Sequence, residues 1–249
     1  MKRLVSQIPN SLTLLNLLSG CAAIMISMQG GLEMAPIIIL IAALFDFSDG
    51  LAARLLNIRS SIGEQLDSLA DMVSFGVAPA FMLYVHMAEM HANPVLPYNQ
   101  PGFTYLEFAG MYLPFIIVIF AAIRLAKFNI DSSQSKAFLG LPTPAMALFF
   151  AASVYLYHHD VRLHEISLLV QPWFWMIMMI AFSVLMILPV RMFSLKFKDL
   201  HWRDNQIRYI FIGISLFLLV SLHTFALPLI IVWYILLSFI YHIFEVKHG

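Results

Sequence analysis

The chain consists of long apolar stretches separated by short polar ones, and this pattern restricts its fold more than any other feature. A helix that crosses the hydrocarbon core of a bilayer needs about 20 mostly apolar residues. Stretches of this kind lie at about 11–28, 34–54, 64–87, 108–127, 142–158, 170–190, 208–224 and 227–245. Because backbone polar groups inside a bilayer must be satisfied within the protein, such stretches fold as helices. The sequence therefore predicts an all-α polytopic membrane bundle of about eight transmembrane helices.

The composition agrees with a membrane protein and excludes some other classes. The chain is 61% hydrophobic and 11% charged, whereas soluble domains are about 45–50% apolar and about 25% charged. A formal net charge of zero and the lack of a basic tail argue against a nucleic-acid partner. Cys21 is the only cysteine, which excludes an intramolecular disulfide and a thiolate metal cluster. No linker composition divides residues 1–249, so we expect a single membrane domain.

The distribution of lysine and arginine predicts the orientation, because these residues prefer cytoplasmic loops. With the N-terminus in the cytoplasm, all 14 basic residues except Arg162 fall on the cytoplasmic side. Both termini are then cytoplasmic. The segment 191–208 carries a net charge of +3, and we expect it to lie along the anionic cytoplasmic leaflet, ahead of the last two helices.

The first apolar stretch has two interpretations. Lys2 and Arg3, followed by an apolar run and then Leu18-Ser19-Gly20-Cys21, imitate a bacterial lipoprotein signal. Polar residues interrupt the run at steps of three, at Asn10, Thr13 and Asn16. That spacing suits a helix lining a polar cavity better.

Four aspartates lie near the predicted cytoplasmic ends of the second and third helices. Asp46 and Asp49 are three residues apart and Asp67 and Asp71 are four apart, so each pair shares one helix face. A short connection makes the two helices antiparallel, which lets all four carboxylates meet in one cleft. Since a carboxylate in hydrocarbon costs several kcal/mol, such a cluster needs compensating charge.

The natural compensating charge for an oxygen-rich cluster is one or two divalent ions, either Mg²⁺ or Mn²⁺. Paired metals recur in enzymes that act on phosphate esters, and Arg54, one turn nearer the cytoplasm, can hold a phosphate oxygen in a forked contact. Two other interpretations stay open. The aspartates are either buried protonated or salt-bridged helix acids, or they form a cation pathway in a divalent-cation transporter.

The spacing of this segment resembles a known signature. The pattern is Asp46-x2-Asp49-Gly50-x2-Ala53-Arg54-x8-Gly63-x3-Asp67-x3-Asp71, which is similar to the complete signature of the CDP-alcohol phosphotransferase family. The resemblance implies a six-helix core, here residues 1–190, with two additional helices in 191–249. It also implies the reaction, in which a hydroxyl attacks the lipid-linked phosphorus of a CDP-lipid and CMP leaves.

Three further segments resemble the membrane-type phosphatidylserine synthases of bacteria within that family: Ser74–Ala80, Arg124–Asn129 and Phe138–Ala145. This resemblance implies CDP-diacylglycerol as donor, L-serine as acceptor, membrane lipids as surroundings, a homodimer, and a site facing the cytoplasm in the bacterial inner membrane. Glycerol 3-phosphate, inositol phosphate or choline is the alternative acceptor.

The family resemblance also assigns roles to residues. Metal ligands would be Asp46, Asp49, Asp67 and Asp71, and Asp71 would be the general base. Donor contacts would come from Asp46, Asp49, Gly50, Arg54 and Ser60, with Asn10, Thr13 and Asn16 at the cytidine. The serine carboxylate needs a cation, which Arg124 or Lys127 can supply, with Asn129 beside them. The alternative for Arg124 and Lys127 is a role as anchors of the topology.

Overall fold

The computed structural model describes residues 7–57, 60–90, 105–130, 138–159, 168–193 and 201–248, and these residues are mostly helical. In chain order the helices are α2 (Ile8–Met28), α3 (Ala35–Leu55), α4 (Ser61–Asp71), the π-helical turn η1 (Met72–Val77), α5 (Ala78–Met90), α6 (Tyr105–Tyr112), α7 (Phe115–Ile130), α8 (Thr143–His159), the 3-10 turn η5 (Leu168–Val170), α9 (Pro172–Ile187), α10 (Trp202–Leu222), the 3-10 turn η6 (His223–Phe225) and α11 (Ala226–His248).

Five described segments are long and apolar enough to cross a membrane: Ile8–Met28, Ala35–Leu55, Ser61–Met90, Ala109–Ile130 and Asn205–Ile243. The last contains both α10 and α11, which meet at His223, where φ is 51°. Two further helices, α8 with 17 residues and α9 with 16, are shorter. The predicted class of a polytopic helical membrane protein is therefore confirmed. The count of eight spans, the side of the termini and the single-domain organisation stay predictions.

Proline and backbone geometry explain several helix boundaries. Pro36 and Pro172 stand in the first turns of α3 and α9, where the missing N–H would have no intrahelical acceptor. Pro114 separates α6 from α7, although the sequence predicted a single helix over 108–127. Between α4 and α5 the chain does not break, because η1 continues the helix as one π-helical turn.

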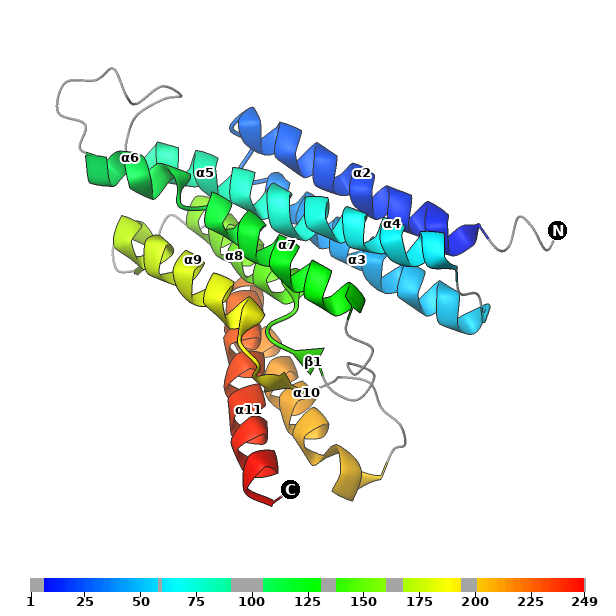
Figure 1. Cartoon of the computed structure of the whole chain (residues 1–249). Helices are drawn as coiled ribbons and strands as arrows, with labels where there is room; N and C mark the ends of the chain where they lie inside the picture. The colour runs from blue at the N-terminus through cyan, green and yellow to red at the C-terminus, as the bar shows by residue number, and fades with distance from the viewer. Residues whose placement is uncertain are drawn as a thin grey trace.

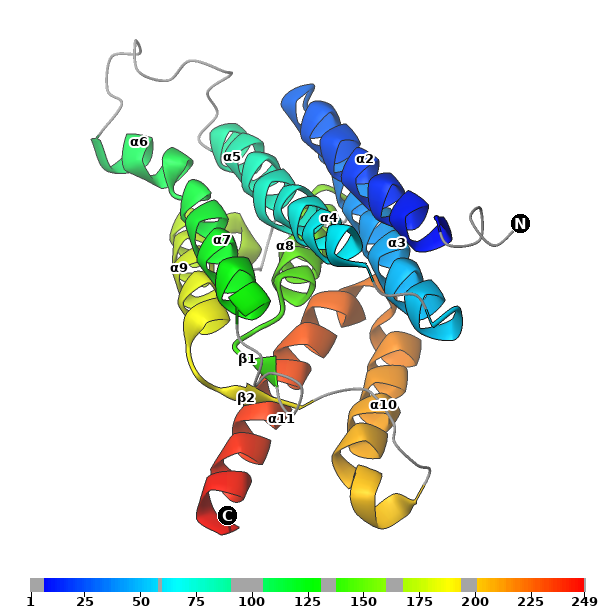
Figure 2. The same ribbon diagram turned by 45° about the vertical axis from the view of Figure 1, so that its right-hand side comes forward.

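The helices α2 to α9 form one bundle, from which the hairpin of α10 and α11 projects (Figures 1 and 2). Helix α2 packs against α3 and along α4, η1 and α5, while α7 packs against η1 and α9. The approach of α2 to η1 is close enough to require glycine, because a Cβ on Gly20 would lie 2.5 Å from Oγ of Ser74. Fully buried Phe75, Phe150 and Trp175 fill the interior.

A two-stranded ribbon, absent from the sequence prediction, closes one end of this bundle. Strand β1 (Phe138–Leu139) pairs antiparallel with β2 (Arg191–Met192). Next to it, Gly140 has φ +75°, and a Cβ there would collide with the carbonyl of Met186. Only glycine tolerates both conditions. Two-residue strands carry too little periodicity to be recognised in a sequence.

Candidate active site

The structure brings the two aspartate pairs together at one end of the bundle. Asp46 and Asp49 lie on α3, and Asp67 and Asp71 lie on α4. One carboxylate oxygen from each of Asp46, Asp49 and Asp67 lies within 4.8 Å of the other two. The carboxyl groups of Asp46 and Asp71 are within hydrogen-bonding reach of each other. The convergence expected from the spacing is therefore present.

This donor set fits a divalent cation. Two carboxylates at hydrogen-bonding distance repel each other unless a proton or a cation lies between them. The groups are only partly exposed, and Asp49 is 6% exposed, so water screens the repulsion poorly. Hard oxygen ligands of this kind suit Mg²⁺ or Mn²⁺. The carboxylates of Asp46, Asp49 and Asp67 are therefore a candidate site for such an ion.

Helix α2 supplies polar side chains to two of the carboxylates. Thr13 Oγ1 donates a hydrogen bond of 2.7 Å to Asp49 Oδ2. Asn16 Nδ2 makes a long contact of 3.5 Å with Asp71 Oδ1. Ser74 on η1 donates to the Asn16 carbonyl at 2.9 Å, which ties that part of α2 to the site.

The partners of Thr13 and Asn16 differ from the cytidine that we expected from the resemblance. Both side chains are buried, Thr13 at 4% exposure and Asn16 at 0%. Asn16 Oδ1 has no hydrogen-bond partner among the described residues. These side chains therefore orient the aspartates in this structure, and a contact with cytidine stays a prediction.

The predicted donor-binding residues surround the connection between α3 and α4. Arg54 Nε donates to the Gly50 carbonyl at 2.9 Å, which leaves the fork of Nη groups for a phosphate. A Cβ on Gly50 would meet nothing within 4 Å, so space for a ligand lies against the backbone there. Ser60 caps α4, since its Oγ accepts from the Gly63 N–H at 2.9 Å.

Asn10, on α2, lies close to the first turn of α4. A Cβ on Gly63 would lie 3.1 Å from Asn10 Oδ1 and 3.0 Å from Ser60 Oγ. The signature glycine thus allows Asn10 and the capping serine to approach α4 together.

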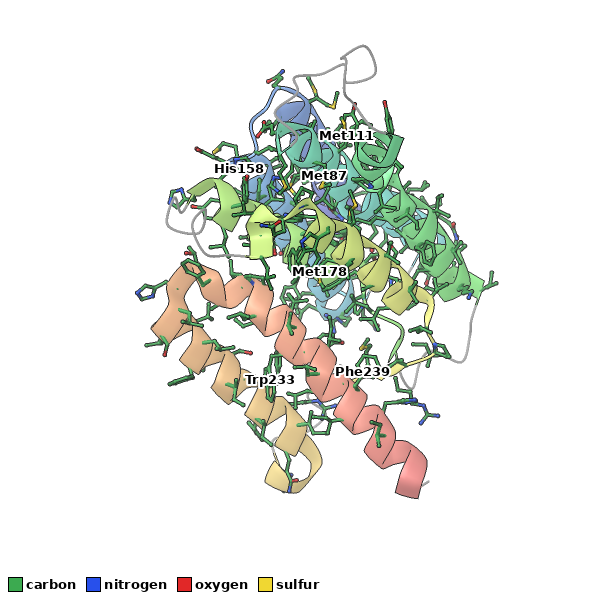
Figure 3. All side chains as sticks on the ribbon, turned by 90° about the vertical axis from the view of Figure 1, so that its left-hand side faces the viewer. Met87, Met111, His158, Met178, Trp233 and Phe239 are labelled. Carbon is green, nitrogen blue, oxygen red and sulfur yellow. The ribbon has the colours of Figure 1, made fainter. Side chains whose placement is uncertain are left out.

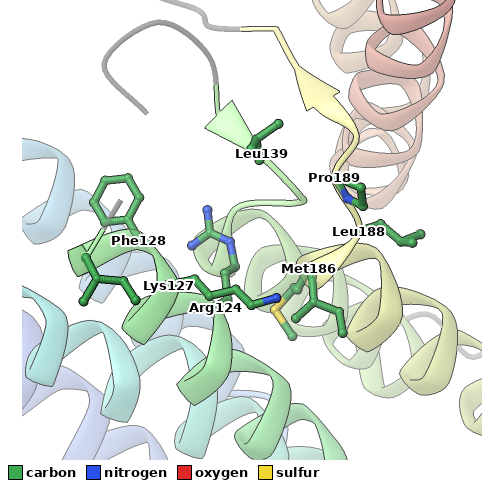
Figure 4. A pocket seen from close by; sticks show the side chains of 9 residues that line it. Arg124, Lys127, Phe128, Leu139, Met186, Leu188 and Pro189 are labelled. Carbon is green, nitrogen blue, oxygen red and sulfur yellow. The ribbon is translucent and has the colours of Figure 1, made fainter. Parts of the chain in front are cut away.

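Arg124 and Lys127 line a cavity of about 260 Å³ at the end of α7. Its other walls are Phe128, Ile130, Leu139, Met186, Ile187, Leu188 and Pro189. Figure 4 shows the Arg124 side chain pointing toward β1 and the Lys127 side chain pointing toward Met186. Arg124 Nη1 lies 3.4 Å from Thr143 Oγ1, and its buried Nε has no partner among the described residues. Arg124 is also within electrostatic range of Asp71.

Asn129, predicted to stand with these two residues, has another position. It does not line the cavity, and its Oδ1 accepts a hydrogen bond of 3.0 Å from Ser68 on α4. This bond joins α7 to the helix that carries Asp67 and Asp71. In the structure Asn129 connects two helices, and its predicted contact with serine stays a prediction.

Sequence reasoning missed Thr143 beside Arg124, Ser68 beside Asn129 and the Met186–Pro189 wall of the cavity. Thr143 stood inside the segment Phe138–Ala145, which resembled the synthase subgroup, but the resemblance assigned no role to this residue. Met186–Pro189 belongs to an apolar run with no polar signal, so only the tertiary structure shows it near Arg124.

The sequence of the chain is similar to those of known proteins. Residues 6–188 match the sequence model of the CDP-alcohol phosphatidyltransferase family. A CDP-diacylglycerol–serine O-phosphatidyltransferase of Bacillus subtilis is 35% identical over 140 residues, 56% of this chain and 71% of that protein. A Mycobacterium leprae protein of the same name is 28% identical over 244 residues, 95% of this chain and 73% of that protein. The archaetidylserine synthase of Methanothermobacter thermautotrophicus is 34% identical over 144 residues, 57% of this chain and 54% of that protein.

Proposed function

We propose, from the premise that this chain belongs to the CDP-alcohol phosphatidyltransferase family, that it transfers a phosphatidyl group from CDP-diacylglycerol to L-serine. The products are phosphatidylserine and CMP. The observation that carries the proposal is the placement of four converging carboxylates beside a cavity lined by Arg124. The names of relatives from Bacillus subtilis and Mycobacterium leprae support serine as the acceptor.

The reaction needs a group that accepts the proton of the attacking hydroxyl, and we assign this role to Asp71. The serine Oγ forms a bond to the lipid-linked phosphorus, and the bond from that phosphorus to the bridging pyrophosphate oxygen breaks. CMP leaves with that oxygen, and the hydroxyl proton passes to the Asp71 carboxylate. Asp71 is within hydrogen-bonding reach of Asp46 and within electrostatic range of Arg124, which supports a position between the proposed donor and acceptor regions.

The donor is held at the start of α4 and the end of α3. Asp46, Asp49, Asp67 and Asp71 are the proposed ligands of one or two divalent cations, which when bound neutralise charge on the pyrophosphate. Arg54 offers its Nη fork to a phosphate, and the Ser60 hydroxyl, whose oxygen caps α4, has its proton free to donate. Thr13 and Asn16 hold the carboxylates in position.

We assign the acceptor to the cavity lined by Arg124 and Lys127. Serine carries a carboxylate, and Arg124 can bind it in a forked arrangement. Because Arg124 Nε is buried without a partner among the described residues, a carboxylate there would satisfy a group that is costly to leave unpaired. Choline offers no anion to this arginine. Reaction at the cytoplasmic face of the inner membrane is part of the proposal.

The test is CMP release by purified protein in mixed micelles with CDP-diacylglycerol and Mg²⁺ or Mn²⁺. Serine, glycerol 3-phosphate, inositol 1-phosphate and choline are supplied separately. We expect release with serine alone, abolished in Asp71→Asn and retained in Glu64→Gln, an exposed carboxylate on the same helix. Release with another acceptor would overturn the serine assignment. Metal transport without CMP release would favour the transporter instead.

A further inference from the structure

A second cluster of metal-binding side chains lies at the opposite end of the bundle. His86 and Glu89 stand on the last turns of α5, and His158 stands on the last turn of α8. The continuous helix from Asp71 to His86 rises about 1.5 Å per residue, which separates the two clusters by about 22 Å. Figure 3 shows His158 and Met87, the neighbour of His86, in the part of the bundle away from the α10–α11 hairpin.

The aromatic surroundings fix the His86 ring. Its side chain is completely buried and packs edge-on against Trp175 and Tyr157, with ring centroids at 4.4 Å and 4.7 Å. Nδ1 of His86 lies 3.2 Å from Nε2 of His158. Nε2 of His86 has no hydrogen-bond partner among the described residues. A buried imidazole is therefore held with one nitrogen aimed at a second imidazole.

Glu89 approaches the same nitrogen of His158. Its Oε2 lies 3.8 Å from His158 Nε2. An imidazole nitrogen carries either one hydrogen or one lone pair, so Nε2 can serve one hydrogen-bond partner at a time. Two partners, a nitrogen and a carboxylate oxygen, nevertheless converge on it. A cation bound between the two imidazole nitrogens would lie on the side of His158 that Glu89 approaches.

We propose that His86 Nδ1 and His158 Nε2 bind a transition-metal ion of the Zn²⁺ class, and that the exposed Glu89 side chain turns toward this ion to supply a third ligand. Two nitrogens bound to Zn²⁺ at about 2.0–2.1 Å and at a tetrahedral angle stand about 3.3 Å apart, close to the 3.2 Å found here. Two imidazoles and one carboxylate, with a further position for water, are a known ligand set for this metal. The site joins the ends of α5 and α8 and is independent of the proposed transferase reaction.

The ligand chemistry separates this site from the aspartate cluster. Imidazole nitrogen favours Cu²⁺, Ni²⁺ and Zn²⁺, whereas an all-carboxylate site suits Mg²⁺ and Mn²⁺. Excess Mg²⁺ therefore occupies the aspartates and leaves the histidines for the softer metal. Cu²⁺ is the best probe, because its electron paramagnetic resonance spectrum reports directly bound nitrogen.

The experiment adds one equivalent of Cu²⁺ to the purified full-length protein in detergent with excess Mg²⁺. We expect nitrogen hyperfine structure from two imidazoles, and Cu²⁺ binding weakened at least tenfold in His158→Ala. The matched control is His159→Ala, which removes the adjacent exposed histidine stacked on Tyr155 and should change neither result. Glu89→Gln keeps the size of the side chain and should weaken binding without removing the nitrogen signal. Equal Cu²⁺ affinity in wild type and His158→Ala, or a spectrum with oxygen ligands only, would overturn the proposal.

Discussion

Thr13 orients the carboxylate of Asp49. Thr13 lies on α2, which is outside the signature segment Asp46–Asp71. Its hydroxyl donates to Asp49 at 2.7 Å, and both residues are buried. Valine has nearly the same shape but no hydroxyl, so Thr13→Val leaves Asp49 free to turn away from the metal position. Because losing such a supporting bond typically costs 10–100-fold in metal affinity, we expect the Mn²⁺ concentration for half-maximal CMP release to rise about tenfold or more.

The control for Thr13 is the conservative variant Thr13→Ser, which keeps the hydroxyl and should restore most of the metal affinity. Direct Mn²⁺ titration, with free Mn²⁺ followed by paramagnetic resonance, separates metal binding from turnover. An unchanged Mn²⁺ requirement in Thr13→Val would show that the hydrogen bond does not support the metal site.

Arg124 and Lys127 line one cavity but differ in environment. Arg124 is partly buried and near Asp71, while Lys127 is exposed. Because hydrogen bonds to charged groups contribute about 1.5–3 kcal/mol, Arg124→Gln should raise the KM for serine about tenfold or more. The KM for CDP-diacylglycerol should change little, and Lys127→Gln should have a smaller effect on both. If Arg124→Gln impairs both substrates equally, or only lowers membrane insertion, the arginine is a topology anchor.

The spacing of residues in the sequence predicted which site residues share one face of a helix. It did not predict which other helix or ligand that face contacts. The intervals within Asp46–Asp71 were sufficient to place four carboxylates together, because a helix repeats every 3.6 residues. The same argument put Thr13 and Asn16 on one polar stripe of α2. Whether that stripe meets cytidine or the aspartates depends on how α2 docks, and docking is a tertiary property.

At the level of elements, the ribbon and the segment before it form one side of the proposed acceptor cavity, and α11 packs against β2. Leu139 of β1 and Met186–Pro189, which precedes β2, line the cavity. On α11, Tyr234 donates to the Phe193 carbonyl at 3.2 Å, and its ring packs against Phe193 and Phe211. Helix α11, although outside the matched residues 6–188, therefore supports the wall opposite Arg124.

This arrangement predicts that Tyr234→Ala acts on the acceptor more than on the donor. Removing the ring opens a gap behind β2, which lets the wall move, so the KM for serine should rise severalfold while metal affinity stays unchanged. Tyr234→Phe keeps the ring and loses only the hydroxyl, and should have a smaller effect. Ile240→Ala, on the exposed face of the same helix at 47% exposure, is the matched control. An effect of Tyr234→Ala on both substrates equally would indicate general destabilisation.

The long apolar helices were predictable from the sequence. The π-helical turn and the exact position of a helix break were not. The ranges of α2 and α3 follow from continuous hydrophobicity bounded by polar residues. The π-helical turn Met72–Val77, directly after Asp71, has no sequence signal, because it arises from how the helix packs on α2 and α7. The turn η6 at His223–Phe225 overlaps the end of the predicted span 208–224, just before the last predicted span, 227–245.

At the scale of the whole molecule, the two ends of the bundle differ in chemistry. One end holds the aspartates, Arg54 and the Arg124 cavity, while the other holds the cluster of His86, Glu89 and His158. Between them the helices present many large apolar side chains at their surface, among them Leu18, Phe47 and Phe217, as expected for contact with lipid. The distribution of lysine and arginine along the chain predicts how this molecule is oriented in a membrane.

The positive-inside distribution predicts that the aspartate end faces the cytoplasm. The single cysteine makes this testable: Cys21→Ser removes the only thiol, and one new cysteine is then placed at Glu64 or at Glu33. Both positions are exposed; Glu64 stands in the first turn of α4 beside the site, and Glu33 lies in the connection between α2 and α3 at the other end. A membrane-impermeant maleimide should label Glu33→Cys in right-side-out vesicles and Glu64→Cys only in inside-out vesicles. The reverse pattern would place the active site outside the cytoplasm, away from its CDP-linked substrate, and would refute the predicted topology.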